Sequence, residues 1–110
     1  MSLDHKIAAL LGFAARSGKL LLGTFSVEEG IRRKRAKLVL AAEDINPRRS
    51  EILCKWCRDM DIPYLEAGMK ADYGALLRKP PLGLLALTDS HMAEGIIKAV
   101  KRSEESNGGD

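Results

Sequence analysis

Two kinds of apolar pattern alternate along the chain. In the first kind, apolar residues recur every three or four positions, as on one face of a helix; the first such face is formed by Leu3, Ile7, Leu10, Leu11 and Ala14. In the second kind, short apolar runs predict strands, and these occupy residues 19–23, 37–44, 62–68 and 82–89. The second and fourth runs are almost continuously apolar, which is typical of strands covered on both faces.

Residues that favour helix ends separate these runs. Asn46 followed by Pro47 predicts a helix start, the Pro80-Pro81 pair predicts a helix end, and Gly18 suits the end of the first helix. Helices are therefore predicted up to about residue 18, over about 24–35, 46–61 and 70–78, and from Asp89 or Ser90 onward with Met92, Ile96, Ile97 and Val100 inward. The element order α-β-α-β-α-β-α-β-α favours an α/β fold with helices on both faces of a sheet, whose strand order this pattern leaves open.

The chain has the size of one domain. With 110 residues it is long enough to bury a core of its own. We expect residues 1–103 to form this single domain and residues 104–110 to form an acidic, polar and disordered tail.

Charge narrows the range of partners slightly. The net charge is +3, but the last seven residues hold three acids and no base, so residues 1–103 carry 18 cations and 12 acids. This excess is compatible with an anionic partner such as RNA. No apolar run approaches the roughly 18 residues of a membrane span, and residues 1–10 lack a signal-peptide pattern. We therefore expect a cytoplasmic protein.

The two cysteines, Cys54 and Cys57, form the motif CKWC. Redox pairs with this spacing usually stand at a helix start, where the thiol pKa is lowered. Here the motif falls in mid-helix, where Ile52, Leu53, Trp56, Cys57 and Met60 form an apolar stripe. We interpret the cysteines as core residues; a redox pair is the alternative, and a zinc site is not expected because no second ligand pair accompanies them.

Motifs that would indicate catalysis are missing from the sequence. It contains no nucleophile elbow, phosphate-binding P-loop, dinucleotide fingerprint or metal-ligand cluster. The adjacent acids Glu43 and Asp44 follow a predicted strand, where α/β enzymes place catalytic groups, but they precede Asn46-Pro47 and suit turn and capping roles better. We expect a protein that is not an enzyme and needs no cofactor or metal.

The segment GTFSVEEGIRRKRAK, residues 23–37, has two interpretations. In the first, Ser26 and Glu29 form a capping box, and Glu28 with Arg32 and Glu29 with Arg33 form ion pairs four residues apart. In the second, a helix start after a glycine offers free N–H groups to a phosphate or a base edge, and the arginines hold an RNA backbone.

Several stretches resemble the kink-turn RNA-binding ribosomal protein family, which includes large-subunit proteins seven-Ae and thirty-e, small-subunit protein twelve-e and the Gadd45-like proteins. They are Gly23 with its following helix, AKLVLAAEDINP and IPYLEAG; the front stretch LLGFAARSGKLLLG is similar to the short bacterial branch. The resemblance implies a three-layer α/β/α sandwich with a mixed four-stranded sheet. It also implies non-catalytic binding of structured, kink-turn-like RNA, ribosomal or other, in translation or ribosome assembly, with ribosome-associated proteins as further partners.

The resemblance also implies which residues meet the RNA. The family motif Gly-x-Asn-Glu-x-x-Lys aligns with residues 23–29, where Phe25 replaces asparagine, Ser26 replaces glutamate and Glu29 replaces lysine. A second RNA-facing loop aligns with residues 78–82. The residues implied in RNA binding are Lys19, Gly23, Thr24, Phe25, Ser26, Glu29, Arg32, Arg33, Arg78 and Lys79. Phe25 can stack on a base, which favours RNA binding, whereas Glu29 reverses the charge of the family's lysine. Because of such departures from the motif, the alternative is a protein-interaction module that kept the fold and lost the RNA site.

Overall fold

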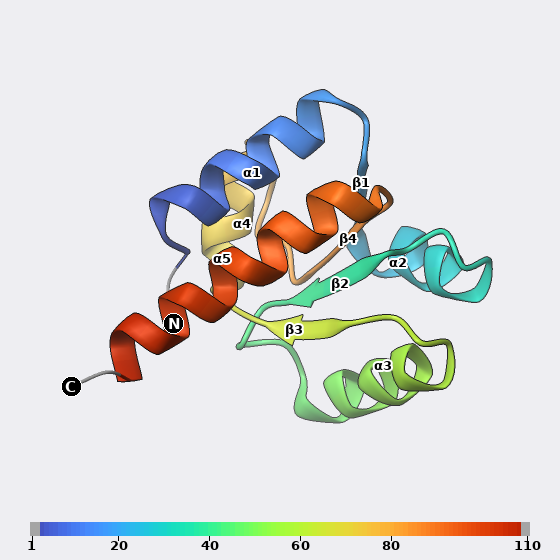
Figure 1. Cartoon of the computed structure of the whole chain (residues 1–110). Coiled ribbons are helices and arrows are strands. Elements are labelled where there is room, and N and C mark those ends of the chain that lie inside the picture. The colour runs from blue at the N-terminus through green and yellow to red at the C-terminus, as the bar shows by residue number, and fades with distance from the viewer. Residues whose placement is uncertain (1–2, 109–110) are drawn as a thin grey trace.

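The computed structural model describes residues 3–108, with side chains up to Ser103 (Figure 1). Five helices and four strands alternate in the described residues, in the predicted order. Their bounds are α1 His5–Arg16, β1 Leu20–Leu22, α2 Gly23–Arg32, β2 Leu38–Ala41, α3 Pro47–Asp59, β3 Tyr64–Glu66, α4 Lys70–Leu77, β4 Leu84–Leu87 and α5 Ser90–Gly108.

The four strands form one mixed sheet in the order β1-β4-β2-β3. β4 is antiparallel to both β1 and β2, whereas β2 and β3 are parallel. The carboxyl ends of β1, β2 and β3 therefore meet the amino end of β4 along one edge of the sheet, which is formed by strand ends and not by an outer strand. We call it the α2-start edge because α2 begins there. The mixed four-stranded sheet that the family resemblance implied is confirmed.

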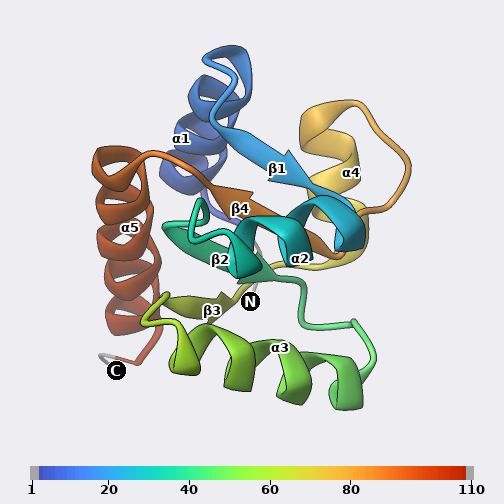
Figure 2. The ribbon, with the colours of Figure 1, turned by 90° about the vertical axis from the view of Figure 1, so that its right-hand side faces the viewer.

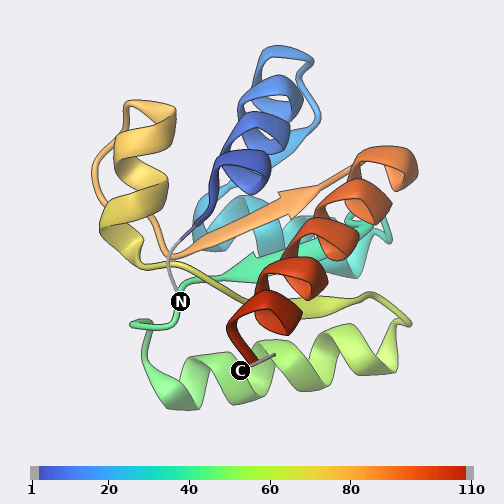
Figure 3. The same ribbon diagram turned by 60° about the vertical axis from the view of Figure 1, so that its left-hand side comes forward.

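Helices cover both faces of the sheet. Figure 3 shows α1 and α5 in front of the sheet and α2 behind it, and α4 packs against α1. Figure 2 shows α2 and α3 from the opposite side, near each other. The central strands β2 and β4 are buried along their whole length between these layers, as their continuous apolar runs predicted.

Side-chain caps fix three of the helix starts. Asp4 accepts a hydrogen bond from the N–H of Ile7 at 2.9 Å, and Asp89 accepts one from Met92 at 2.9 Å. The predicted cap Asn46 accepts one from Arg48 at 2.9 Å. These bonds satisfy N–H groups that have no partner inside their helices.

Three predictions about the helices need correction. α2 begins at Gly23 and ends at Arg32, earlier at both ends than predicted. Ile52 and Trp56 are 48% and 39% exposed, so the predicted apolar stripe of α3 was too broad, and the face that α3 buries is formed by Leu53 and Cys57. The α5 backbone is helical to Gly108, beyond the expected end near 103. Residues 109–110 of the predicted tail lie outside the described residues, and its disorder stays a prediction.

Candidate nucleic-acid interface

The start of α2 is open to solvent. Gly23 follows β1 directly, with φ of +88°, a conformation that glycine adopts without strain. A Cβ added at Gly23 would have nothing within 4 Å. Among the residues that the structure describes, no side chain caps the helix: the N-cap residue is Leu22, and the first turn contains no acid. Three N–H groups at this end therefore remain available to a ligand.

The predicted capping box of Ser26 and Glu29 is wrong. A capping box requires Ser26 to precede the helix, but the positive φ of Gly23 starts the helix three residues earlier. Ser26 consequently lies inside the helix, half-buried, and Glu29 lies in the following turn. Neither side chain closes the start of α2.

A hollow of about 380 Å³ opens beside this helix start, and we call it the tip hollow. Four chain segments meet there, as the sheet order requires: the start of α2, the β2–α3 connection, the start of α4, and the loop before β4. Residues that line it include Gly23, Thr24, Asn46, Arg49, Lys70 and Leu82. Arg49 and Lys70 place two cations beside the start of α2, where the free N–H groups and the helix dipole favour an anion.

The loop before β4, residues 78–83, is held in place by α4. The N–H of Lys79 donates to the carbonyl of Gly74 at 2.9 Å, and the N–H of Leu82 donates to that of Lys70 at 3.1 Å. A Cβ on Gly74 would lie 2.9 Å from two carbonyl oxygens of the loop, so only glycine permits this packing. Arg78 and Lys79 are exposed at the beginning of this loop, and its later residues Pro81, Leu82 and Gly83 line the tip hollow.

Asp44 connects two of the segments that form the tip hollow. Its Oδ1 accepts a hydrogen bond from the N–H of Lys70 at 2.9 Å, which ties the β2–α3 connection to the start of α4. This agrees with the turn and capping role predicted for Asp44.

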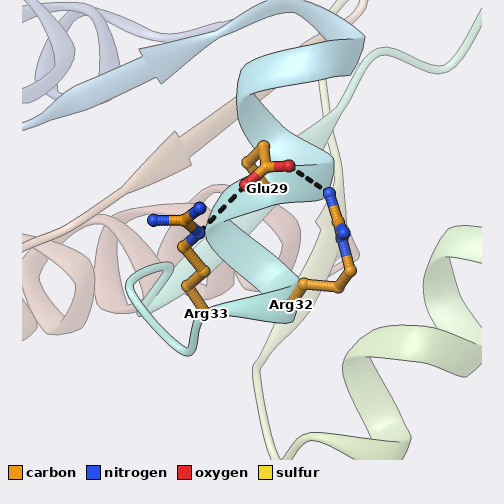
Figure 4. Close-up of polar contacts among 3 residues, drawn as sticks. All are labelled: Glu29, Arg32 and Arg33. Carbon is orange, nitrogen blue, oxygen red and sulfur yellow. Dashed lines mark hydrogen bonds and ion pairs between the residues drawn. The ribbon is translucent and has the colours of Figure 1, made fainter.

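Glu29 forms ion pairs with two arginines, as Figure 4 shows. Its Oε1 lies 3.1 Å from Nε of Arg33, and its Oε2 accepts a hydrogen bond from Arg32. The ion pair with Arg33 was predicted. The trio carries a net positive charge, so Glu29 does not make this end of α2 acidic.

The other predicted ion pair of α2, between Glu28 and Arg32, is wrong. Glu28 turns toward α3, where its Oε2 lies 3.5 Å from the Nη1 of Arg49, while Arg32 turns to Glu29. The contact joins residues 21 positions apart, and helical spacing within α2 could not reveal it.

Phe25 stands on the surface beside α2. Its side chain is 77% exposed, so Phe25 does not belong to the core. It borders a second hollow of about 420 Å³, which also includes Ser26, Glu29 and Arg33. Exposing an aromatic ring of this size to water is unfavourable, and a base stacked on it would remove that exposure.

The structure does not bring the predicted site residues together at one place. Gly23 and Thr24 line the tip hollow, and Phe25, Ser26, Glu29 and Arg33 line the second hollow. Arg78 and Lys79 begin the loop whose later residues reach the tip hollow. Lys19 precedes β1 at the opposite edge, where its carbonyl accepts from Thr88 at 3.0 Å, and Arg32 and Arg33 lie at the far end of α2.

Arg49 and Lys70 were not predicted as site residues. Each follows a strand that runs parallel to β1, Arg49 after β2 and Lys70 after β3. This position in the sequence was the signal that could have identified them as site residues. It becomes informative only when the strand order is known.

The CKWC motif lies in mid-helix, as predicted. Cys57 is buried and Cys54 is half-buried. Burial raises the pKa of Cys57 to about 12, with a smaller contribution from Cys54, so its thiol stays protonated near neutral pH and is a poor nucleophile. Among the described residues no three metal-binding side chains cluster, and no helix among them is long and apolar enough to cross a membrane.

Two relatives align with most of this chain. A large ribosomal subunit protein eL8 from Thermoplasma volcanium is 32% identical over 103 residues, which are 93% of this chain and 85% of that protein. The RNA-binding protein YlxQ of Bacillus subtilis is 33% identical over 88 residues, which are 80% of this chain and 88% of that protein.

Solved structures share the fold. A protein of unknown function from Bacillus halodurans C superimposes with a TM-score of 0.85 at 22% identity, covering 89% of this chain and 99% of that chain. The 15.5kD RNA binding protein of Giardia lamblia gives a TM-score of 0.73 at 19% identity, covering 94% and 92%. Residues 5–103 match one family profile. The chain belongs to the Ribosomal protein L7Ae/L30e/S12e/Gadd45 family.

Proposed function

We propose that this protein binds structured RNA of the kink-turn type at the α2-start edge, without catalysing a reaction, in translation or ribosome assembly. Family membership and the name of the Bacillus subtilis relative, an RNA-binding protein, support the class of ligand. The observation that carries the proposal is the uncapped start of α2 beside the tip hollow. Cytoplasmic residence and association with ribosomal proteins belong to the same proposal.

The helix start supplies the central contact. Its free N–H groups and the positive end of the helix dipole attract a phosphate or a base edge. Because Gly23 has no side chain, the RNA backbone can approach the helix closely. Thr24 adds an exposed hydroxyl that can donate to a phosphate oxygen.

Cations from other elements surround this contact. Arg49 and Lys70 line the tip hollow, and Arg78 and Lys79 extend from the neighbouring loop. A sharply bent RNA brings phosphates of two strands together, and cations on several sides of one hollow suit that arrangement. Phe25 replaces hydrogen-bond readout by stacking, which tolerates any base.

Binding to a kink-turn RNA and to a plain duplex of equal length tests the proposal. Fluorescence anisotropy at two salt concentrations should show at least about tenfold tighter binding of the kink-turn at both, since shape recognition persists when phosphate attraction is screened. Equal, weak and strongly salt-dependent binding of both RNAs would contradict it. Absence of binding would favour a protein-interaction module.

A further inference from the structure

α3 carries an exposed apolar stripe that its role in the core does not use. Leu53 and Cys57 face the sheet, whereas Ile52 and Trp56 are 48% and 39% exposed. Exposed apolar residues that adjoin one another and are bordered by polar residues are candidates for a binding surface. Trp56 is the only tryptophan of the chain.

The stripe is continuous with the tip hollow. Arg49, Ile52 and Trp56 follow one another at spacings of three and four residues, so they lie along one flank of α3. From Arg49 to Trp56 the helix rises roughly 10 Å. Arg49 itself lines the tip hollow together with Gly23 and Thr24.

The same flank faces α2. The contact of Arg49 with Glu28, at 3.5 Å, joins the two helices. Arg32 follows Glu28 by four residues and therefore lies on the side of α2 toward α3. It pairs with Glu29, which also pairs with Arg33, so the three side chains together carry one net positive charge (Figure 4). Cations thus border the apolar stripe on both helices.

The charge of α3 favours an anionic occupant over a protein surface. The helix contains four cations, Arg48, Arg49, Lys55 and Arg58, against the acids Glu51 and Asp59. Glu28 is engaged by Arg49, and Asp59 lies 3.6 Å from Lys55, so these acids are partly neutralised. Aromatic and cationic side chains that alternate along a surface are the usual binding elements for single-stranded nucleic acid.

We propose that this stripe binds a single-stranded RNA segment that leaves the bent loop in the tip hollow, with one base stacked on Trp56 and the backbone held by Arg49. The segment passes over Ile52, which contacts a base or a sugar. The distance from Arg49 to Trp56, roughly 10 Å along the helix, accommodates a short segment of the strand. This inference extends the proposed function and rests on it for the position of the bent loop.

The test compares a kink-turn RNA with the same RNA carrying a short single-stranded uridine tail at one or the other end. Affinity is measured by anisotropy, and the fluorescence of Trp56 reports stacking directly. A tail at the correct end should tighten binding about tenfold, within the range of one stacked base, and should quench Trp56. Trp56→Ala should abolish the gain without changing affinity for the RNA that lacks a tail.

Two variants keep the result interpretable. Trp56→Phe retains a ring and should preserve part of the gain, which separates stacking from an effect on folding. Phe13→Ala removes another exposed aromatic, on α1 and 52% exposed, and should preserve the whole gain. A tail that adds no affinity at either end, or a gain that survives Trp56→Ala, would overturn the inference.

If the proposed kink-turn binding is wrong, the experiment gives a result that differs from the failure of the single-strand site. If neither kink-turn RNA binds, the uridine oligonucleotide alone is titrated against the protein. Quenching of Trp56 by it would then support a single-strand site independent of kink-turns, and no quenching would overturn this inference as well. If the stripe served a protein partner, the oligonucleotide would leave the fluorescence of Trp56 unchanged.

Discussion

Replacing Glu29 by lysine is expected to tighten binding of a kink-turn RNA by about tenfold. The change removes a carboxylate, which beside a phosphate at about 4 Å costs roughly 1 kcal/mol even in water. It also releases Arg32 and Arg33 and adds a further cation where the family motif has one. Since about 1.4 kcal/mol corresponds to a factor of ten in affinity, these effects together reach the expected change.

The cost to the fold should be small. Glu29 forms exposed ion pairs only, each worth about 0–1 kcal/mol, and no capping box is lost because none exists. Glu94→Lys supplies the matched control, because Glu94 is exposed on α5, which begins at the opposite edge of the sheet. If both variants tighten binding equally, the gain is nonspecific electrostatics; if Glu29→Lys has no effect, the family's docking geometry does not apply here.

Replacing Gly23 by aspartate should weaken kink-turn binding by roughly 10- to 100-fold, from the repulsion between the new carboxylate and a phosphate. The new side chain would occupy the space through which the RNA backbone approaches the helix start. It would also place a non-glycine residue at φ of +88°, which should destabilise the fold by about 1 kcal/mol.

Gly18→Asp separates the effect on binding from the effect on stability. Gly18 also has positive φ, +69°, and also has nothing within 4 Å of an added Cβ, but it precedes β1 at the other edge of the sheet. Urea denaturation should show a loss for Gly18→Asp at least as large as for Gly23→Asp, because a carboxylate is unfavourable at the C-terminal end of α1 and favourable at the N-terminal end of α2. Anisotropy should show lost affinity for Gly23→Asp alone. Equal affinities of the two variants would exclude the start of α2 as the contact.

The element order was predictable because each apolar run or face reflects a local environment. The buried strands β2 and β4 consist almost wholly of aliphatic residues, and Asn46 marks its helix start by its own chemistry. The strand order was not predictable from the pattern, because it depends on pairings between residues far apart in the chain. The family resemblance supplied the mixed sheet instead.

The site was predictable only where it is local. Gly23 and the residues just after it stand out in the sequence. Their freedom from capping depends on the backbone turn at Gly23, which places Ser26 inside the helix. Arg49 and Lys70 join the site because the sheet brings the ends of β2 and β3 beside α2, and the pairing of Glu28 with Arg49 crosses between two helices.

An NMR titration of isotope-labelled protein with a kink-turn RNA tests the central claim most directly. Binding at the α2-start edge predicts that the largest changes in backbone amide shifts fall on residues 23–26 and on Lys79, Leu82 and Gly83, and that residues 34–37, at the opposite edge, change little. A plain duplex should not reproduce this pattern. Changes centred on residues 34–37, or the same changes with the plain duplex, would contradict the account.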